Sequence, residues 1–144
     1  MRVLINTNII LDAMMDREPW SKSAQDVILA VAEEKVEGLI TASSFTDIHY
    51  LLRKHLGDKI KIKQALLGLL SIVRILDVNG VDCEKAFDLP MADYEDALLA
   101  YCGKRHKVDC IVSRNIKHYE GSPVKAVEPE DLLRGIINRQ LHAE

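Results

Sequence analysis

The sequence lacks the features of several specialised protein classes. No apolar run approaches the roughly 20 residues of a membrane-spanning helix, so no transmembrane segment is expected. No stretch is rich enough in proline, glycine or serine to form a linker, and no internal repeat occurs. The 144 residues therefore predict one domain, residues 1–144, which is large enough to bury a hydrophobic core.

A disulfide framework is also not expected. The chain has three cysteines, an odd number, and a predicted strand follows Met1 directly, so we expect no signal peptide and a cytoplasmic protein with free thiols. Cys102, His106 and Cys110 lie four residues apart, a spacing that suggests a metal site. Residues 107–109 should end the helix before Cys110, however, so buried cysteines are the expected outcome.

An excess of positive charge is absent as well. The formal net charge is −3, which argues against a protein that coats double-stranded nucleic acid. The charge does not exclude a nuclease, because a nuclease site can hold acidic groups and reach phosphate through a cation.

What the sequence does contain is an alternation of short apolar runs and amphipathic stretches. The apolar runs predict β-strands at residues 2–5, 39–42, 73–78, 110–112 and 124–127. The other stretches predict helices at residues 9–15, 21–35, 45–56, 59–72, 91–107 and from 129, with a short helix ending at residue 87. This alternation predicts the α/β class: a three-layer α/β/α sandwich with a central, mostly parallel sheet of four or five strands.

Polar residues and glycines predict where several elements begin and end. Asn8, Ser21 and the pair Ser43–Ser44 are expected helix N-caps. Gly38 is expected to end the helix before it, and Asn79–Gly80 is expected to form a turn.

Small polar and acidic residues recur at the predicted strand ends. Asn6 follows the first strand, Asp47 comes just after the second, and residues 113–115 follow the fourth. The carboxyl ends of parallel strands share one rim of a sheet, where ligands bind. Asp93 and Asp96 lie one turn apart near the start of a helix that could point at the same rim.

Carboxylates gathered at one rim repel each other unless a hard cation neutralises them. Mg²⁺ and Mn²⁺ prefer oxygen ligands, lower the pKa of a bound water and stabilise charge on a phosphoryl oxygen. The residues alone therefore predict metal-assisted phosphodiester hydrolysis.

Four segments, in this order, resemble the motifs of PIN-domain nucleases, and of the VapC-type toxins of toxin–antitoxin pairs in particular. The segments are residues 3–12, 43–48, 92–98 and 111–115. The resemblance implies a compact α/β/α sandwich and Mg²⁺- or Mn²⁺-dependent cleavage of an RNA substrate. It also implies an antitoxin protein as partner, which often occludes the site, and a homodimer as a common assembly.

The resemblance assigns the site residues by position. The first acidic ligand falls on Asn6, the second on Asp47 and the third on Asp96, with Asp93 beside it as a further catalytic acid; the fourth metal ligand falls on Asn115. Side chains that would orient these groups and hold waters are Thr7, Asn8 and Ser113. Candidate contacts to substrate are Arg53, Arg114 and Lys117.

Asn6 departs from the family pattern, which has an aspartate there. An amide carries no negative charge, offers one oxygen and cannot act as a base. We therefore predict weak metal binding and little or no cleavage by this chain. Either an introduced inactivating substitution or natural divergence would give an asparagine here.

Two other interpretations are open from the sequence. The first is a non-catalytic PIN-like module that binds RNA or protein, which Asn6 favours. The second is a phosphoacceptor signalling domain, which needs an aspartate after a central strand and a suitably placed lysine. Asp77 is the one comparable aspartate, and no partner lysine is evident.

Overall fold

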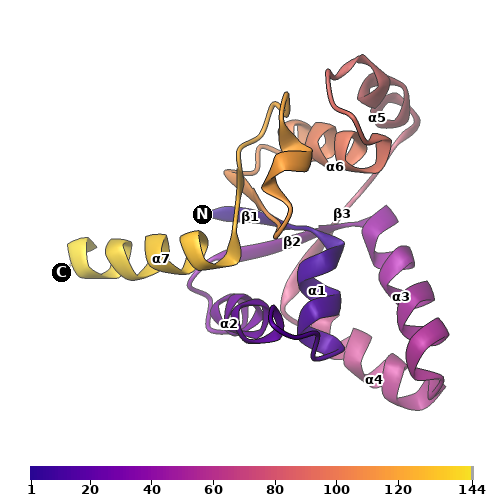
Figure 1. Cartoon of the computed structure of the whole chain (residues 1–144), viewed down its shortest axis with the longest axis vertical. Coiled ribbons are helices and arrows are strands. Elements are labelled where there is room, and N and C mark those ends of the chain that lie inside the picture. The colour runs from indigo at the N-terminus through magenta and orange to yellow at the C-terminus, as the bar shows by residue number, and fades with distance from the viewer. Residues whose placement is uncertain (144) are drawn as a thin grey trace.

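The computed structural model describes residues 1–143 and shows a five-stranded parallel sheet between layers of helices (Figure 1). The spatial strand order is β3-β2-β1-β4-β5, so β1 lies in the middle. The strands are β1 Arg2–Ile5, β2 Glu37–Thr41, β3 Val73–Leu76, β4 Cys110–Val112 and β5 Ala126–Val127. The predicted α/β sandwich is confirmed, and every strand pairing is parallel.

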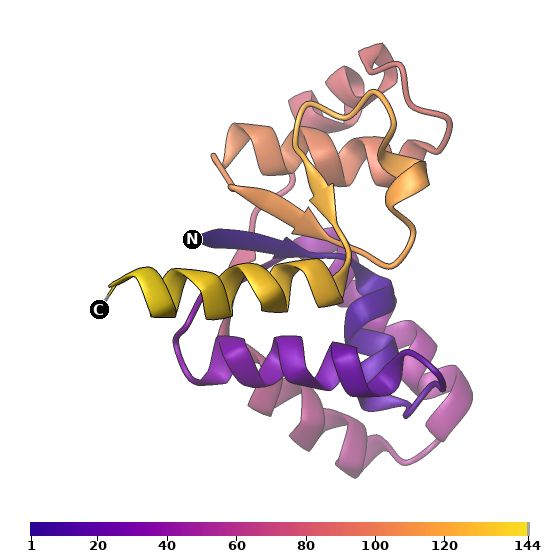
Figure 2. The same cartoon turned by 60° about the vertical axis from the view of Figure 1, so that its left-hand side comes forward.

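Helices cover both faces of the sheet. They are α1 Thr7–Met14, α2 Ser21–Ala32, α3 Ala42–Leu56, α4 Lys59–Leu70, α5 Gly80–Lys85, α6 Tyr94–Arg105 and α7 Pro129–Ala143, with 3-10 turns η1 Ala86–Asp88 and η2 Ile116–Tyr119. Figure 2 shows α1, α2 and α7 on the opposite side of the sheet from α6. Within residues 1–143, no helix is long and apolar enough to cross a membrane.

Alternate side chains of each strand enter two separate cores. Val3 and Ile5 of β1 pack in the core with α1, α2, α3, α4 and α7, whereas Leu4 packs on the other face with Leu99 and Ala100 of α6. All three β1 side chains are fully buried. Burial on both faces explains why the strands appear in the sequence as continuous apolar runs rather than alternating patterns.

Two predicted helix starts are wrong by a few residues, because side chains just upstream form the caps. Asn6, not Asn8, caps α1: its side chain accepts a hydrogen bond from the Asn8 backbone N–H. Thr41 caps α3 by accepting from the Ser44 backbone N–H, so α3 begins at Ala42 rather than after Ser43–Ser44. Both helices therefore start directly at the strand ends.

The predictions for Ser21 and Asn79–Gly80 are also corrected. Ser21 does not cap α2, since its hydroxyl donates to the Glu18 carboxylate instead. Asn79 caps α5 rather than forming a simple turn. Its side-chain oxygen accepts from the Asp82 backbone N–H, and its backbone N–H donates to the Asp82 carboxylate, which is a capping box.

Gly38 does not end α2, which stops at Ala32, but lies within β2. A Cβ atom at Gly38 would lie 2.7 Å from Val31 Cγ1 and 2.9 Å from Val31 Cγ2. Glycine is needed at this position because α2 packs against the strand at close range.

Gly38→Ala should therefore lower the free energy of unfolding by about 1–3 kcal/mol, since the stiff valine cannot move away. Gly68→Ala is the matched control: Gly68 lies inside α4 with nothing within 4 Å of an added Cβ. Alanine there should stabilise by about 0.5–1 kcal/mol. Urea denaturation of both variants measures the difference, and equal stabilities would contradict the close contact.

Candidate functional site

A polar pocket of about 280 Å³ lies where β1 and β2 end and α1, α3 and α6 begin. We call it the rim pocket; its lining residues are Asn6, Thr7, Ser43, Ser44, Asp47, Glu95, Asp96, Leu98 and Leu99. The structure thus brings together Asn6, Asp47 and Asp96, three of the predicted metal ligands, with Thr7, a predicted supporting residue, beside them. The N-termini of α1, α3 and α6 meet at this pocket. Because a helix N-terminus favours negative charge, they help the fold to tolerate the clustered carboxylates.

The side-chain amide of Asn6 forms hydrogen bonds through both its oxygen and its nitrogen. Its Oδ1 accepts a hydrogen bond from the Asn8 backbone N–H at 3.0 Å, and its Nδ2 donates to the hydroxyl of Tyr119. The residue therefore starts α1 and contacts η2 at the same time.

Both carboxylate oxygens of Asp96 lie close to polar groups of the protein. The Tyr119 hydroxyl donates to Oδ1 at 3.2 Å, and His118 Nδ1 lies 3.3 Å from Oδ2. Burial raises the pKa of Asp96 above its ordinary value and the Asp93 carboxylate adds to this, while Tyr119 and His118 oppose it. Burial also raises the pKa of Tyr119, with a further contribution from the Asp96 charge.

The remaining predicted acids occupy different surroundings. Asp47 is exposed on α3, and its side chain has no hydrogen bond or ion pair with any residue in the described range 1–143. Asp93 caps α6: its Oδ1 accepts from the Asp96 backbone N–H at 2.9 Å. The sequence interpretation missed Glu95, which lines the rim pocket beside Asp96. Its position in the first turn of α6, next to Asp96, was the available signal.

Ser113, at the end of β4, is fully buried and links two predicted site residues. Its hydroxyl accepts from Asn8 Nδ2 at 3.3 Å and from the Asn115 backbone N–H at 3.1 Å. Ser113 and Asn8 therefore brace the start of α1 against β4. Asn115 itself is exposed and does not line the rim pocket.

Arg114 faces α1 rather than the rim pocket. Its Nε lies 2.7 Å from Oδ2 of Asp12, which is fully buried, and its guanidinium carbon lies 4.0 Å from the centre of the Trp20 ring. This guanidinium neutralises a buried carboxylate. Arg53 lines a neighbouring groove on α3, and Lys117 is exposed on η2, so neither of these two cations lines the rim pocket.

The residues as they stand do not fit the cation that the resemblance implies. Asp96 has both oxygens engaged, and Asn6 supplies no charge and presents N–H groups toward Tyr119. Across residues 1–143, no group of three or more His, Cys, Asp or Glu side chains could hold a metal ion. The pocket brings together residues that the resemblance assigns to the site, but they do not form a complete set of metal ligands.

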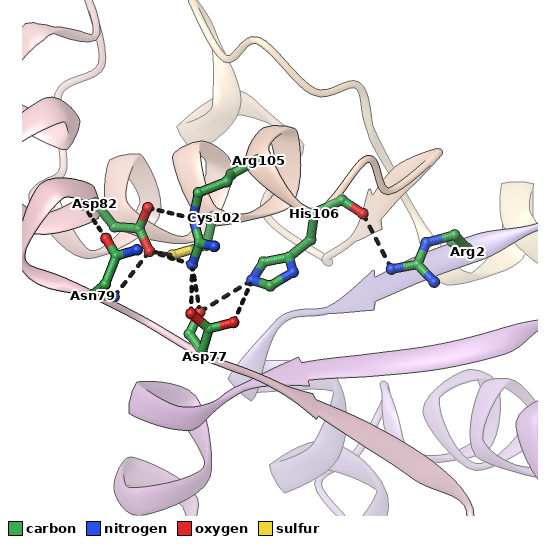
Figure 3. Close-up of polar contacts among 7 residues, drawn as sticks. All are labelled: Arg2, Asp77, Asn79, Asp82, Cys102, Arg105 and His106. Atoms are coloured by element: carbon green, nitrogen blue, oxygen red, sulfur yellow. Dashed lines mark hydrogen bonds and ion pairs between the residues drawn. The ribbon is translucent and has the colours of Figure 1, made fainter.

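A second polar network ties α5 and α6 to the segment after β3 (Figure 3). Asp82 is fully buried and lies 2.7 Å from both Nε and Nη2 of Arg105, while the Cys102 thiol donates to it at 3.4 Å. Asp77 pairs with Arg105 at 3.1 Å and with His106 at 3.2 Å. The network is structural, because its hydrogen bonds and ion pairs join α5, α6 and the segment after β3.

The surroundings of the cysteines and of Asp77 decide two interpretations of the sequence, the metal site and the phosphoacceptor domain. Cys102 and Cys110 are buried free thiols, as predicted, and burial raises the pKa of Cys102 to about 12 and that of Cys110 to about 11. Asp77 follows β3, an edge strand, and is paired with cations. The phosphoacceptor interpretation, which needs a free aspartate after a central strand, is therefore not supported.

The fold and the rim pocket define the class of this protein. A family model described as PIN domain matches residues 2–117, and the chain belongs to the PIN domain family. The family resemblance of the four sequence segments is thereby confirmed.

Solved structures agree with this assignment. The chain is similar to VapBC2 of Rickettsia felis, bound to a DNA fragment from its promoter, with TM-score 0.68, 18% identity and coverage of 89% of this chain and 98% of that one. It is also similar to a toxin–antitoxin complex from Klebsiella pneumoniae, with TM-score 0.65, 19% identity and coverage of 88% of this chain and 97% of that one. A third similar structure is VapC20 of Mycobacterium tuberculosis, a sarcin–ricin loop cleaving toxin, with TM-score 0.61, 13% identity and coverage of 76% of this chain and 86% of that one. At these identities the likeness shows the fold. No curated protein sequence matches significantly.

Asp82→Asn should lower the free energy of unfolding by about 3 kcal/mol near neutral pH, because it removes the charge that Arg105 faces in a buried pair. Burial alone would raise the pKa of Asp82, but hydrogen bonds from Arg105, the Asn79 backbone and Cys102 outweigh it and hold the pKa below 3.8. The stabilisation is therefore present above pH 3.8 and is lost as the pH falls through the lower, folded-state pKa.

Denaturant titrations at a series of pH values measure the free energy of unfolding of Asp82→Asn and of the unchanged chain. The difference between the two free energies should become smaller in acid. Asp131→Asn is the control, since Asp131 forms an exposed ion pair with Arg134 and should cost about 0.5 kcal/mol or less. A gap that is independent of pH would contradict the assigned charge of Asp82.

Proposed function

We propose that this chain is a toxin-type PIN-domain ribonuclease of a toxin–antitoxin pair, with its cleavage weakened or abolished by Asn6. The observation that carries the proposal is the rim pocket, where Asn6, Asp47, Glu95 and Asp96 meet at the carboxyl ends of parallel strands. Membership of the PIN domain family supports a nuclease role for that pocket. One structural neighbour, VapC20, is a sarcin–ricin loop cleaving toxin, which supports RNA as the substrate class.

The chain's own groups explain why position 6 decides the activity. Asp47, Glu95 and Asp96 give the pocket negative charge, which repels a phosphodiester. A bound Mg²⁺ or Mn²⁺ would supply the compensating charge and a more acidic water. The amide of Asn6 lacks the charge to complete such a ligand set. Thr7, Ser43 and Ser44 place hydroxyl groups at the same edge, where they would orient water or phosphate oxygens.

An antitoxin partner is part of this proposal. The structural neighbours include VapBC2 and a toxin–antitoxin complex. The candidate surface is a groove of about 400 Å³ between α3 and α4. Its apolar lining residues are Phe45, Ile62, Leu66, Leu67 and Leu70, and its cationic residues are Arg53, Lys59 and Lys63. An antitoxin segment with alternating apolar and acidic side chains is complementary to this groove, and a homodimer through the same face is the competing assembly.

One observation favours a second candidate function. Asn6 and Asp96 are both bonded to Tyr119, so these two side chains have polar partners without a cation. A PIN-like module that binds RNA or protein without turnover has these properties. Such a module would bind RNA equally well with asparagine or aspartate at position 6.

Asn6→Asp should raise the rate of RNA cleavage with Mg²⁺ or Mn²⁺ by at least about 10–100-fold over the unchanged chain, since it restores a carboxylate beside the cation. A fluorescent single-stranded RNA, followed in time with and without EDTA, measures the rate. The double variant Asn6→Asp/Asp47→Asn is the matched control, and it should return cleavage to background and exclude a contaminating nuclease. An Asn6→Asp protein that is folded and cleaves no faster than the unchanged chain would contradict the nuclease proposal.

A further inference from the structure

Tyr119 is a buried residue of the site that none of the family-like segments contains. It ends η2, and only 6% of it is exposed. Its hydroxyl accepts a hydrogen bond from Asn6 Nδ2 and donates one to Asp96 Oδ1 at 3.2 Å. The tyrosine oxygen thus lies between two side chains that the family's pattern makes metal ligands.

The direction of these hydrogen bonds is fixed by chemistry. The Asn6 NH₂ group only donates, an ionised Asp96 carboxylate only accepts, and the phenol has a single proton to donate. The three side chains therefore form one polarised chain that runs from Asn6 through Tyr119 to Asp96. The Tyr119 hydroxyl proton points at the Asp96 carboxylate. A cation bound by Asp96 would place its positive charge against the same oxygen.

We propose that the Tyr119 hydroxyl closes the metal position, occupying with Asn6 the coordination space beside Asp96 that a divalent cation would need. The proposal rests on the proposed function, because only a PIN nuclease requires a cation there. His118 completes the closure by engaging the second Asp96 oxygen at 3.3 Å. Closure by Tyr119 is a separate obstacle to metal binding from the missing charge at residue 6.

Asparagine and tyrosine are a matched pair in this arrangement. An aspartate at position 6 would be an acceptor only, and the single Tyr119 proton cannot serve two carboxylates at once. Residue 6 and Asp96 would then repel each other across one hydroxyl, which favours entry of a cation. The hydroxyl would still compete for Asp96, however. Asn6→Asp alone should therefore restore metal binding only in part.

The test is Mn²⁺ affinity, measured by electron paramagnetic resonance or calorimetry on the full chain. Asn6→Asp/Tyr119→Phe should bind Mn²⁺ at least about tenfold more tightly than Asn6→Asp. Tyr119→Phe alone should bind weakly, since residue 6 still lacks charge. The matched control is Tyr101→Phe in the Asn6→Asp background: Tyr101 lies on α6, outside the rim pocket, and its loss of a hydroxyl should not change the affinity.

A second measurement needs no change at Tyr119. In the unchanged chain, the Tyr119 hydroxyl proton should exchange slowly enough to be seen by NMR and should show a nuclear Overhauser effect to the Asn6 side-chain NH₂ protons. A hydroxyl proton without any contact to Asn6 would overturn the closed arrangement, even if Tyr119→Phe fails to fold.

The two proposals fail in different ways. Equal Mn²⁺ affinity of Asn6→Asp with and without Tyr119→Phe would overturn the role of Tyr119 and leave the nuclease proposal intact. If neither variant binds Mn²⁺ and neither cleaves RNA, the proposed function is overturned, and the role of Tyr119 with it.

Discussion

The site depends on the position of β1 in the middle of the parallel sheet. This strand pairs with β2 on one side and β4 on the other, and its Val3, Leu4 and Ile5 side chains are completely buried. The chain then turns directly into α1, with Asn6 as the junction. Because so much apolar surface fixes β1, residue 6 is held at the sheet rim, and the ends of β2 and β4 bring Asp47 and Ser113 to the same edge.

Electrostatics then determines what the rim pocket does. Three helix N-termini favour acidic groups there, and protein donors satisfy part of the charge: Tyr119 and His118 engage Asp96, while Asp93 caps its own helix. Asp47 remains exposed without a side-chain partner in the part of the chain that the structure describes. In our proposal, an amide and a phenol stand in this pocket where a PIN nuclease site would hold a carboxylate and a cation.

Much of this arrangement could be predicted from the sequence, because it depends on local patterns. Apolar runs located β1 and β4 to the residue. Polar residues after the strands placed Asn6 and Asp47 at one rim, and the start of a predicted helix placed Asp96 there. Tyr119 and the Asp12–Arg114 pair could not be predicted. Tyr119 lies 113 residues from Asn6 and 23 residues from Asp96, and Arg114 lies 102 residues from Asp12. Only the tertiary packing of η2 and α1 creates those contacts. The prediction for Gly38 was wrong for the same reason, since the constraint comes from Val31 packing across it.

Position 6 and Tyr119 together, in our proposal, keep a cation out of an otherwise intact PIN site. The most direct measurement is anomalous diffraction at the manganese edge from crystals of Asn6→Asp/Tyr119→Phe and of the unchanged chain, both soaked in Mn²⁺. We predict a manganese peak between residue 6, Asp47 and Asp96 in the double variant and no peak there in the unchanged chain. A manganese peak at that place in the unchanged chain, with Tyr119 still bonded to Asp96, would contradict the proposed closure.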